Sequence, residues 1–126
     1  MRGASALQRV LEEVPRKPLR VFVVWEPVIF TDIAPPIGRV LARVADPRAS
    51  QYWDKDLLLS REIVRSAQSD PAHSLHSDDL GEGAIVWDFV AVFPSGARWE
   101  TASFPSPDYH GAPVVRATDE LRRRLR

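Results

Sequence analysis

Each of the four tryptophans in this chain is followed directly by a carboxylate residue. The pairs are Trp25-Glu26, Trp53-Asp54, Trp87-Asp88 and Trp99-Glu100. Neighbouring side chains of a β-strand point to opposite faces, so such a pair places an indole on one face and a charge on the other. A carboxylate in apolar surroundings needs a partner or takes up a proton, and carboxylates of this kind are frequent in acid–base sites.

The candidate positions lie in two segments. Asp88 is the single charge in the apolar segment 84–93, so we expect it to pair with an arginine or to carry a shifted pKa. Glu26 and Asp32 lie just after a predicted strand, where open α/β sheets bind ligands. The candidate ligand or partner site therefore consists of Trp25, Glu26, Asp32, Trp87 and Asp88. In the structural alternative, Trp25 packs in the core, Glu26 faces solvent or caps a helix, and Asp88 forms a salt bridge or lies on an edge strand.

A histidine cluster lies in the polar, turn-rich segment 69–83. His73 and His76, followed by two aspartates, form the pattern H-x-x-H-x-D-D, and His110 is a further imidazole. Imidazole and carboxylate ligands suit Zn²⁺ or Ni²⁺. The same residues are equally typical of a solvated loop, so the pattern predicts no metal or cofactor by itself. Asp54 is most simply a helix cap.

Composition limits the class of protein. With 126 residues the chain is expected to form one domain, 1–126, in which 1–18 is an N-terminal helix and linker. Seventeen basic and seventeen acidic residues cancel, so charge predicts neither nucleic-acid nor membrane binding. The chain has no cysteine, which excludes disulfides and thiolate catalysis. Because there is no signal-peptide pattern and no apolar run near the roughly 20 residues that span a bilayer, we expect a cytoplasmic protein.

Hydrophobic periodicity and turn residues predict an N-terminal helix followed by the order β-α-β-α-β-β-α, with a further short strand before the last helix. The segment 19–25 is mostly apolar on both alternating faces, as is typical of a central strand covered on both sides. Strands separated by helices favour parallel pairing, while the turn at 94–96 favours an antiparallel hairpin. The predicted strands lie at 19–25, 49–53, 84–93, 98–104 and 113–115, and the predicted helices follow Ser5, include 37–44 and 55–68, and begin at Thr118.

Three segments resemble the thioredoxin family. They are VFVVW at 21–25, IAPPIGRVLARVAD at 33–46 and VAVFPSGARW at 90–99. In that family a strand ends at an active-site tryptophan, the redox loop and a helix with Ile-Ala-Pro follow, and a β-hairpin comes later. The resemblance covers residues 19–126 and implies an α/β fold, a thioredoxin-like three-layer α/β/α sandwich with a mixed central sheet, here preceded by an N-terminal helix.

The residues of the family's redox chemistry are missing. Its CxxC motif is replaced by residues 26–29, and Gly83-Ala84 stands where the family has its cis-proline. Thiol–disulfide exchange needs an attacking thiolate, so we expect a non-redox binding or assembly module for a protein or a small ligand, with self-association left open. Phe30, Phe104 and Tyr109 are candidates for the partner surface, because aromatic residues are enriched at interfaces.

An enzyme is the competing hypothesis. It would be a carboxylate- or metal-dependent enzyme that uses Glu26, Asp32 and Asp88, with the histidine-containing segment as a lid. The two hypotheses differ in what the substitution Asp88→Asn does. A binding module should change only in stability, whereas an enzyme should lose activity while it stays folded.

Overall fold

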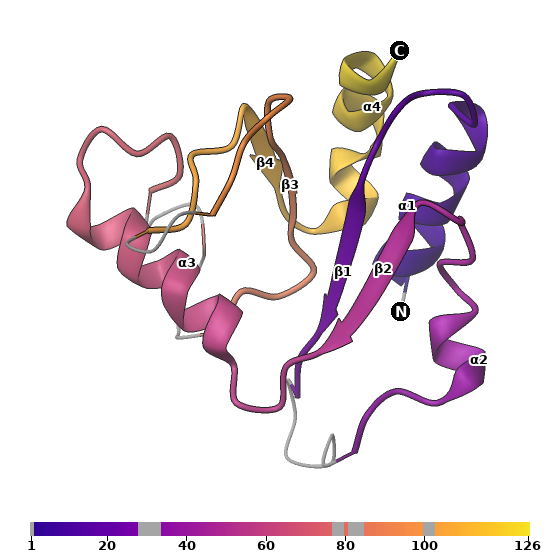
Figure 1. Ribbon diagram of the computed structural model, residues 1–126, viewed down its shortest axis with the longest axis horizontal. Helices are drawn as coiled ribbons and strands as arrows, with labels where there is room; N and C mark the ends of the chain where they lie inside the picture. The colour runs from indigo at the N-terminus through magenta and orange to yellow at the C-terminus, as the bar shows by residue number, and fades with distance from the viewer. Residues whose placement is uncertain (1, 28–33, 77–79, 81–84, 100–102) are drawn as a thin grey trace.

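The computed structural model describes residues 2–27, 34–76, 80, 85–99 and 103–126 (Figure 1). Asp32, Phe30, Asp78 and Asp79 lie outside these residues. The protein is a mixed α/β protein, as predicted. Its elements are α1 (Arg2–Glu13), β1 (Val21–Trp25), α2 (Gly38–Leu41), β2 (Ala49–Trp53), α3 (Leu58–Ser69), β3 (Val90–Val92), β4 (Tyr109–Gly111) and α4 (Val114–Leu125).

The two terminal helices, α1 and α4, pack against each other although they lie at opposite ends of the chain (Figure 1). Apolar residues three or four positions apart give each helix one buried stripe. The buried residues are Ala6, Val10 and Leu11 in α1 and Val114, Ala117, Leu121 and Leu125 in α4. Both helices begin earlier than predicted, because Ser5 lies inside α1 and Thr118 lies inside α4.

Strands β1 and β2 form a parallel pair in which Val21 is opposite Ala49 and Trp25 is opposite Trp53. This confirms the predicted second strand and its parallel pairing. One face of the pair is covered, since Gln51 Nε2 donates hydrogen bonds to the carbonyls of Leu41 at 3.0 Å and Val44 at 2.9 Å. The other face is open.

The predicted cover on both faces of β1 is therefore wrong, because Phe22 is 64% exposed. The physical reason is that each helix packs on another part of the protein. α1 and α4 pack against each other, α2 is reduced to the four residues Gly38–Leu41, and α3 packs on the segments around β3. None of these is left to cover the second face of β1.

A second core lies under α3. Ile63 and Ala67 of this helix pack with Leu75 and Phe104, and Phe93 meets the Phe104 ring edge-on at 5.3 Å between centroids. The predicted helix 55–68 is thus confirmed with slightly shifted ends. Phe104 was expected on a partner surface, which is wrong, because its ring is part of this core.

The second sheet consists of β3 and β4, with Val90 opposite Gly111 and Val92 opposite Tyr109 in antiparallel register. An antiparallel pair was predicted, but its partner strand is different, because the described residues of 98–104 form no strand. A turn does occur at 94–97, where the Ala97 N–H donates to the Pro94 carbonyl at 3.1 Å. The structure thus contains two separate two-stranded sheets in the described ranges rather than the single mixed sheet that we expected.

The predicted strand 84–93 is wrong over its first half, because residues 85–89 are irregular. The chain bends at Asp88, whose φ of +50° lies in the left-handed region that aspartate tolerates better than most residues. The carbonyl of Asp88 accepts the N–H of Val114 at 2.9 Å, so the bend also holds the start of α4. A continuous strand would have placed the Asp88 carboxylate among apolar side chains, at a cost that the bend avoids.

Within the described ranges, no helix has both the length and the apolar character needed to cross a bilayer.

Candidate functional site

The carboxyl ends of β1 and β2 bring together two of the tryptophan–carboxylate pairs. Trp25 and Trp53 are register partners, so Glu26 and Asp54 follow at the same edge of the sheet. The Asp54 N–H donates to the Trp25 carbonyl at 2.9 Å and extends the pairing to these residues. We refer to Glu26 and Asp54 as the carboxylate pair.

Glu26 is held by the first turn of α3. Its Oε1 accepts the backbone N–H of Ser60 at 3.1 Å, and its Oε2 accepts the Ser60 hydroxyl in a short hydrogen bond. Ser60 is buried, and its Oγ in turn accepts the N–H of Val86 at 3.0 Å. One serine therefore joins the end of β1, the start of α3 and the segment before β3.

Asp54 lies before the same helix. Its Oδ2 accepts the Leu59 N–H at 2.8 Å, which confirms the sequence-based expectation that Asp54 caps this helix. A carboxylate at a helix N-terminus satisfies backbone N–H groups that have no partner within the helix. Leu57, just before α3, has a φ of 57°, so the chain turns sharply between the aspartate and the helix that it caps.

The environment moves the pKa values of the two carboxyl groups in opposite directions. Burial raises the pKa of Glu26 above its ordinary value, against the hydrogen bonds from Ser60, and the nearby charge of Asp54 adds to the increase. Burial acts to raise the pKa of Asp54 as well, but the backbone N–H groups of Leu59, Leu58 and Asp56 together hold it below its ordinary value. The pair therefore combines an ionised carboxylate with a carboxyl group that accepts a proton more readily.

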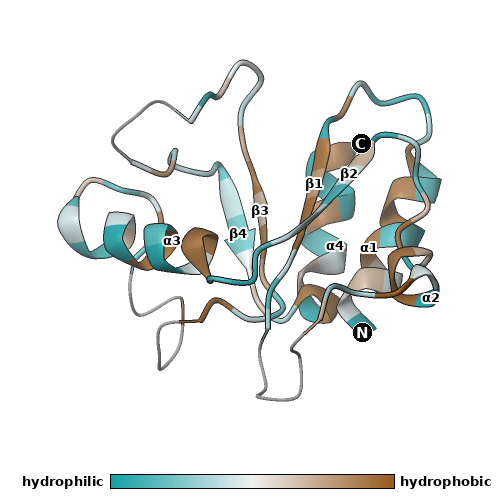
Figure 2. Ribbon diagram, turned by 60° about the horizontal axis from the view of Figure 1, so that its bottom comes forward, coloured by the Kyte–Doolittle hydropathy of each residue, from teal (hydrophilic) through white to brown (hydrophobic). Residues whose placement is uncertain are grey.

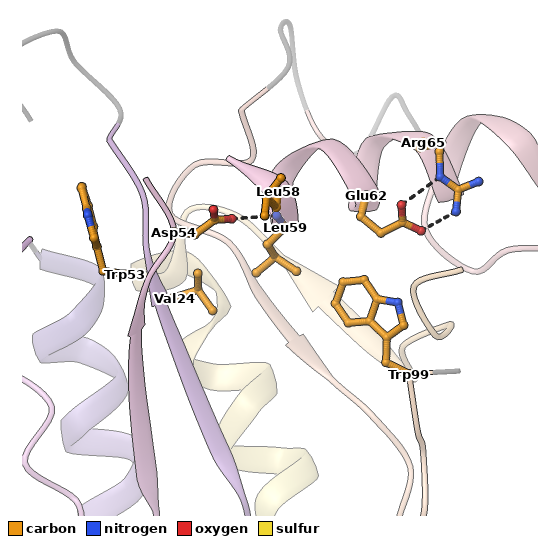
Figure 3. A pocket seen from close by; sticks show the side chains of 8 residues that line it. All are labelled: Val24, Trp53, Asp54, Leu58, Leu59, Glu62, Arg65 and Trp99. Atoms are coloured by element: carbon orange, nitrogen blue, oxygen red, sulfur yellow. Dashed lines mark hydrogen bonds and ion pairs between the residues drawn. The ribbon is translucent and has the colours of Figure 1, made fainter. Parts of the chain in front are cut away.

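A broad, open depression of about 710 Å³ lies in front of this edge (Figure 3). It is lined by Val24, Trp53, Asp54, Leu58, Leu59, Glu62, Arg65 and Trp99. In Figure 3 the Val24, Leu59 and Trp99 side chains lie around its centre, whereas the Trp53 indole lies on the far side of the strands. Arg65 and Glu62 form an ion pair at its rim, with Nε and Oε2 2.8 Å apart.

Apolar side chains continue from this depression across the open face of β1 and β2. Val24 and Tyr52 are register partners, and Phe22 shares the face of Val24 because side chains two positions apart on a strand point the same way. The Phe22 and Tyr52 rings lie 6.4 Å apart between centroids. In Figure 2, β1 and the first turn of α3 are among the hydrophobic parts of the ribbon. We call this surface the aromatic face; it consists of Phe22, Val24, Tyr52, Leu58 and Trp99.

Much of the aromatic face is accessible to solvent. Phe22 is 64% exposed, Leu58 63%, Tyr52 53% and Trp99 51%. Trp99 is fixed from behind, because its ring meets Phe104 of the second core edge-on at 5.3 Å between centroids. The face therefore has a rigid base and an open surface.

The structure places the other predicted site residues apart from the carboxylate pair. Trp25 is half-buried and donates from Nε1 to Gln51 Oε1 at 3.0 Å. Trp87 is 66% exposed and lies in the irregular segment before β3. Asp88 lies against the first turn of α1, so close to Gly3 that a Cβ on this glycine would be 1.9 Å from Asp88 Oδ1. The structure thus places the Asp88 carboxylate beside the first turn of α1, and the ion pairs between described residues do not include the arginine partner that was one of our two expectations.

His73 and His110 make contacts that stabilise the fold. His73 is buried, and its Nε2 lies 2.9 Å from the Phe104 carbonyl while its Nδ1 accepts the Leu75 N–H at 3.2 Å. These bonds connect the segment after α3 to the second core. His110 stacks on Phe89 with centroids 6.1 Å apart. Among the residues that can be placed, no group of three or more side chains is arranged to hold a metal ion.

Sequence reasoning did not place Asp54 and Ser60 in the site. The signal for Asp54 was present, because Trp25-Glu26 and Trp53-Asp54 end two strands that were predicted to be parallel. Aligned strands that end in the same dipeptide bring the two carboxylates to one edge. Ser60 carried no comparable signal, because its contact with Glu26 spans 34 positions of sequence.

No family model, curated protein or solved structure matches this chain.

Proposed function

We propose that this protein is a non-redox, thioredoxin-like binding module and that it binds a protein through the aromatic face. The observation that carries the proposal is the exposure of three aromatic rings and Leu58 around Val24, which lines the depression with Leu58 and Trp99 and is the register partner of Tyr52. Contiguous apolar patches of this kind mark interaction sites, and aromatic residues are enriched at the centres of interfaces. The thioredoxin-like part is supported by the order of the elements, the parallel β1–β2 pair and the position of Trp25 at the end of β1.

The rigid placement of the aromatic side chains also supports protein binding by the aromatic face. Trp99 is braced by Phe104, and the Phe22 and Tyr52 rings lie on paired strands, so binding would order few side chains. Interfaces gain affinity when the contacting groups are already in place, because less conformational entropy is lost on association. A small ligand would be enclosed more completely than this open surface allows.

Two tryptophan substitutions test the proposal. Trp99→Ala removes a ring of the aromatic face, and Trp87→Ala removes a ring that is also exposed but lies outside it. The immobilised wild-type protein and both variants are incubated with extract of the source organism, and the bound proteins are quantified by mass spectrometry. We expect Trp99→Ala to lose proteins that the wild type and Trp87→Ala retain. Identical sets of bound proteins for all three would contradict the proposal.

General acid–base catalysis is the second candidate, and one observation favours it. The pKa values of Glu26 and Asp54 are moved apart at the edge of one depression, as in sites where one carboxyl group donates a proton and another stays ionised. In this version of the enzyme hypothesis Asp54 replaces Asp88, which lies against α1. Assays with chromogenic esters, glycosides and phosphate monoesters test it. An activity that Glu26→Gln abolishes without unfolding the protein supports catalysis, and an activity that survives this change contradicts it.

A further inference from the structure

The aromatic face has charges of opposite sign at its two ends. Arg20 directly precedes β1, is exposed, and lies two positions before Phe22. Asp54 follows Tyr52 at the other end, and the hydrogen bonds from the start of α3 keep it ionised. The long direction of the aromatic face therefore runs from a basic end to an acidic end.

We propose that the aromatic face binds a second copy of this chain in a twofold-symmetric dimer. The inference rests on the proposed function and names the protein that is bound. A twofold axis places the same surface patch on both sides of an interface, and an axis that lies in the interface across the strands also reverses the strand direction. Arg20 of each copy is then brought towards Asp54 of the other, so the charges attract, whereas a parallel arrangement would oppose like charges.

The exposed area of the aromatic face comes close to what such a dimer needs. With side-chain areas of about 200 Å² for aromatic residues, the exposed parts of the aromatic face come to roughly 500 Å² per copy. Two copies would thus bury roughly 1,000 Å², which is the lower limit for a specific interface. The rim side chains add to this area, and the rings at its centre are the residue types that contribute most to binding.

Net charge favours a second copy as well. Seventeen basic and seventeen acidic residues leave a formal net charge of zero at pH 7. Two copies therefore approach each other without the long-range repulsion that keeps strongly charged proteins apart. The charges at the rim of the depression are also balanced, because Glu62 is paired with Arg65.

Sedimentation equilibrium of the purified protein over a wide concentration range is the first test. We expect a reversible monomer–dimer equilibrium for the wild type. Phe22→Arg should raise the dimer Kd by roughly tenfold or more, as for a residue at the centre of an interface. Trp87→Ala, the control outside the aromatic face, should leave the Kd unchanged. Arg20→Glu should weaken the dimer less, and its effect should shrink in high salt because salt screens exposed charges. A wild-type protein that stays monomeric throughout overturns the inference.

A photo-crosslinker separates failure of the dimer from failure of the binding function. Ser50 is exposed and is the register partner of Phe22, so p-benzoylphenylalanine in its place lies on the aromatic face. The same group at Arg116, which is exposed on α4, is the control. Illumination of the purified protein should give an adduct of twice the chain mass from position 50 and none from position 116.

Illumination in extract completes the test. An adduct with a different protein from position 50, without the double-mass adduct, overturns the dimer and keeps the binding function. The absence of any adduct specific to position 50 overturns both. This readout does not require a substitution in any of the five residues of the aromatic face, so it decides the question even if a variant fails to fold.

Discussion

Tryptophan–carboxylate dipeptides lie in two different structural environments in this protein. Trp25-Glu26 and Trp53-Asp54 end neighbouring strands in register, and their carboxylates lie together. Trp87-Asp88 lies in a bend, with an exposed indole and a carboxylate against α1. Strand pairing explains the difference, because β1 and β2 satisfy each other's backbone up to the dipeptides, while β3 begins only at Val90.

Two of the three carboxylates nevertheless share one solution. Glu26 accepts an N–H from the first turn of α3, and Asp54 accepts another from that turn. Helix N-termini offer unpaired N–H groups and a partial positive charge. A carboxylate that follows a strand can thus be stabilised by a helix that comes later in the chain.

The largest effect should come from removal of the serine that joins the carboxylate pair to the rest of the protein. Ser60→Ala leaves Glu26 without its hydroxyl donor and the Val86 N–H without its acceptor. Both groups are poorly solvated, so we expect a loss of about 3 kcal/mol in the free energy of unfolding. Urea titration followed by tryptophan fluorescence measures it, with the exposed Ser69→Ala as a control that should change little. Equal stabilities would show that the Ser60 bonds do not hold the pair.

The close approach at Asp88 gives the next largest effect. Gly3→Ala places a methyl group against the Asp88 carboxylate and should cost about 2 kcal/mol, as overpacking does. Gly38→Ala in α2 is the matched control, because a Cβ there meets nothing within 4 Å. Alanine is the better helix former, so this control should stabilise the protein by about 0.5 kcal/mol. In thermal unfolding, Gly3→Ala should have a lower Tm than the wild type and Gly38→Ala a higher one.

Asp88→Asn is a smaller test of the same region. The amide keeps the shape of the side chain and removes the charge that favours the N-terminus of α1, so we expect a loss of about 0.5–1 kcal/mol. The dimer Kd should stay that of the wild type, since Asp88 is not part of the aromatic face. A folded variant with wild-type stability but impaired binding would place Asp88 in the functional surface after all.

The pH dependence of Glu26 should be the smallest effect. Because burial raises its pKa in the folded protein, its stabilising contribution is complete below the ordinary value of 4.5 and is lost as the pH rises through the folded-state pKa. Wild-type stability should therefore increase relative to Glu26→Gln as the pH falls from 7 towards 4.5, and the difference should become constant below it. Urea titrations of both proteins at each pH measure this difference, and the comparison removes the contribution of the other acidic groups to the pH dependence. A difference that does not vary with pH would contradict the raised pKa.

Local patterns predicted several elements well. The 49–53 strand and the helix with Ile63 inside were found because β-alternation and helical spacing are properties of neighbouring residues. The segment 84–93 was the clearest strand in the sequence and proved wrong over half its described length, because the demands of one charge and of the α4 N-terminus outweighed its propensity. Phe104 was misplaced for a related reason, since a segment without regular structure can still supply a core residue.

The sequence by itself excluded thiol chemistry and located several of the regular elements. Without cysteine there is no thiol chemistry, and the spacing of apolar residues selects helices and strands. Only the tertiary structure decided that Glu26 meets Asp54 and Ser60, that Asp88 meets Gly3, and that one face of β1 remains open. These contacts join residues far apart in the chain, and their geometry depends on how whole elements pack, which neighbouring residues do not specify.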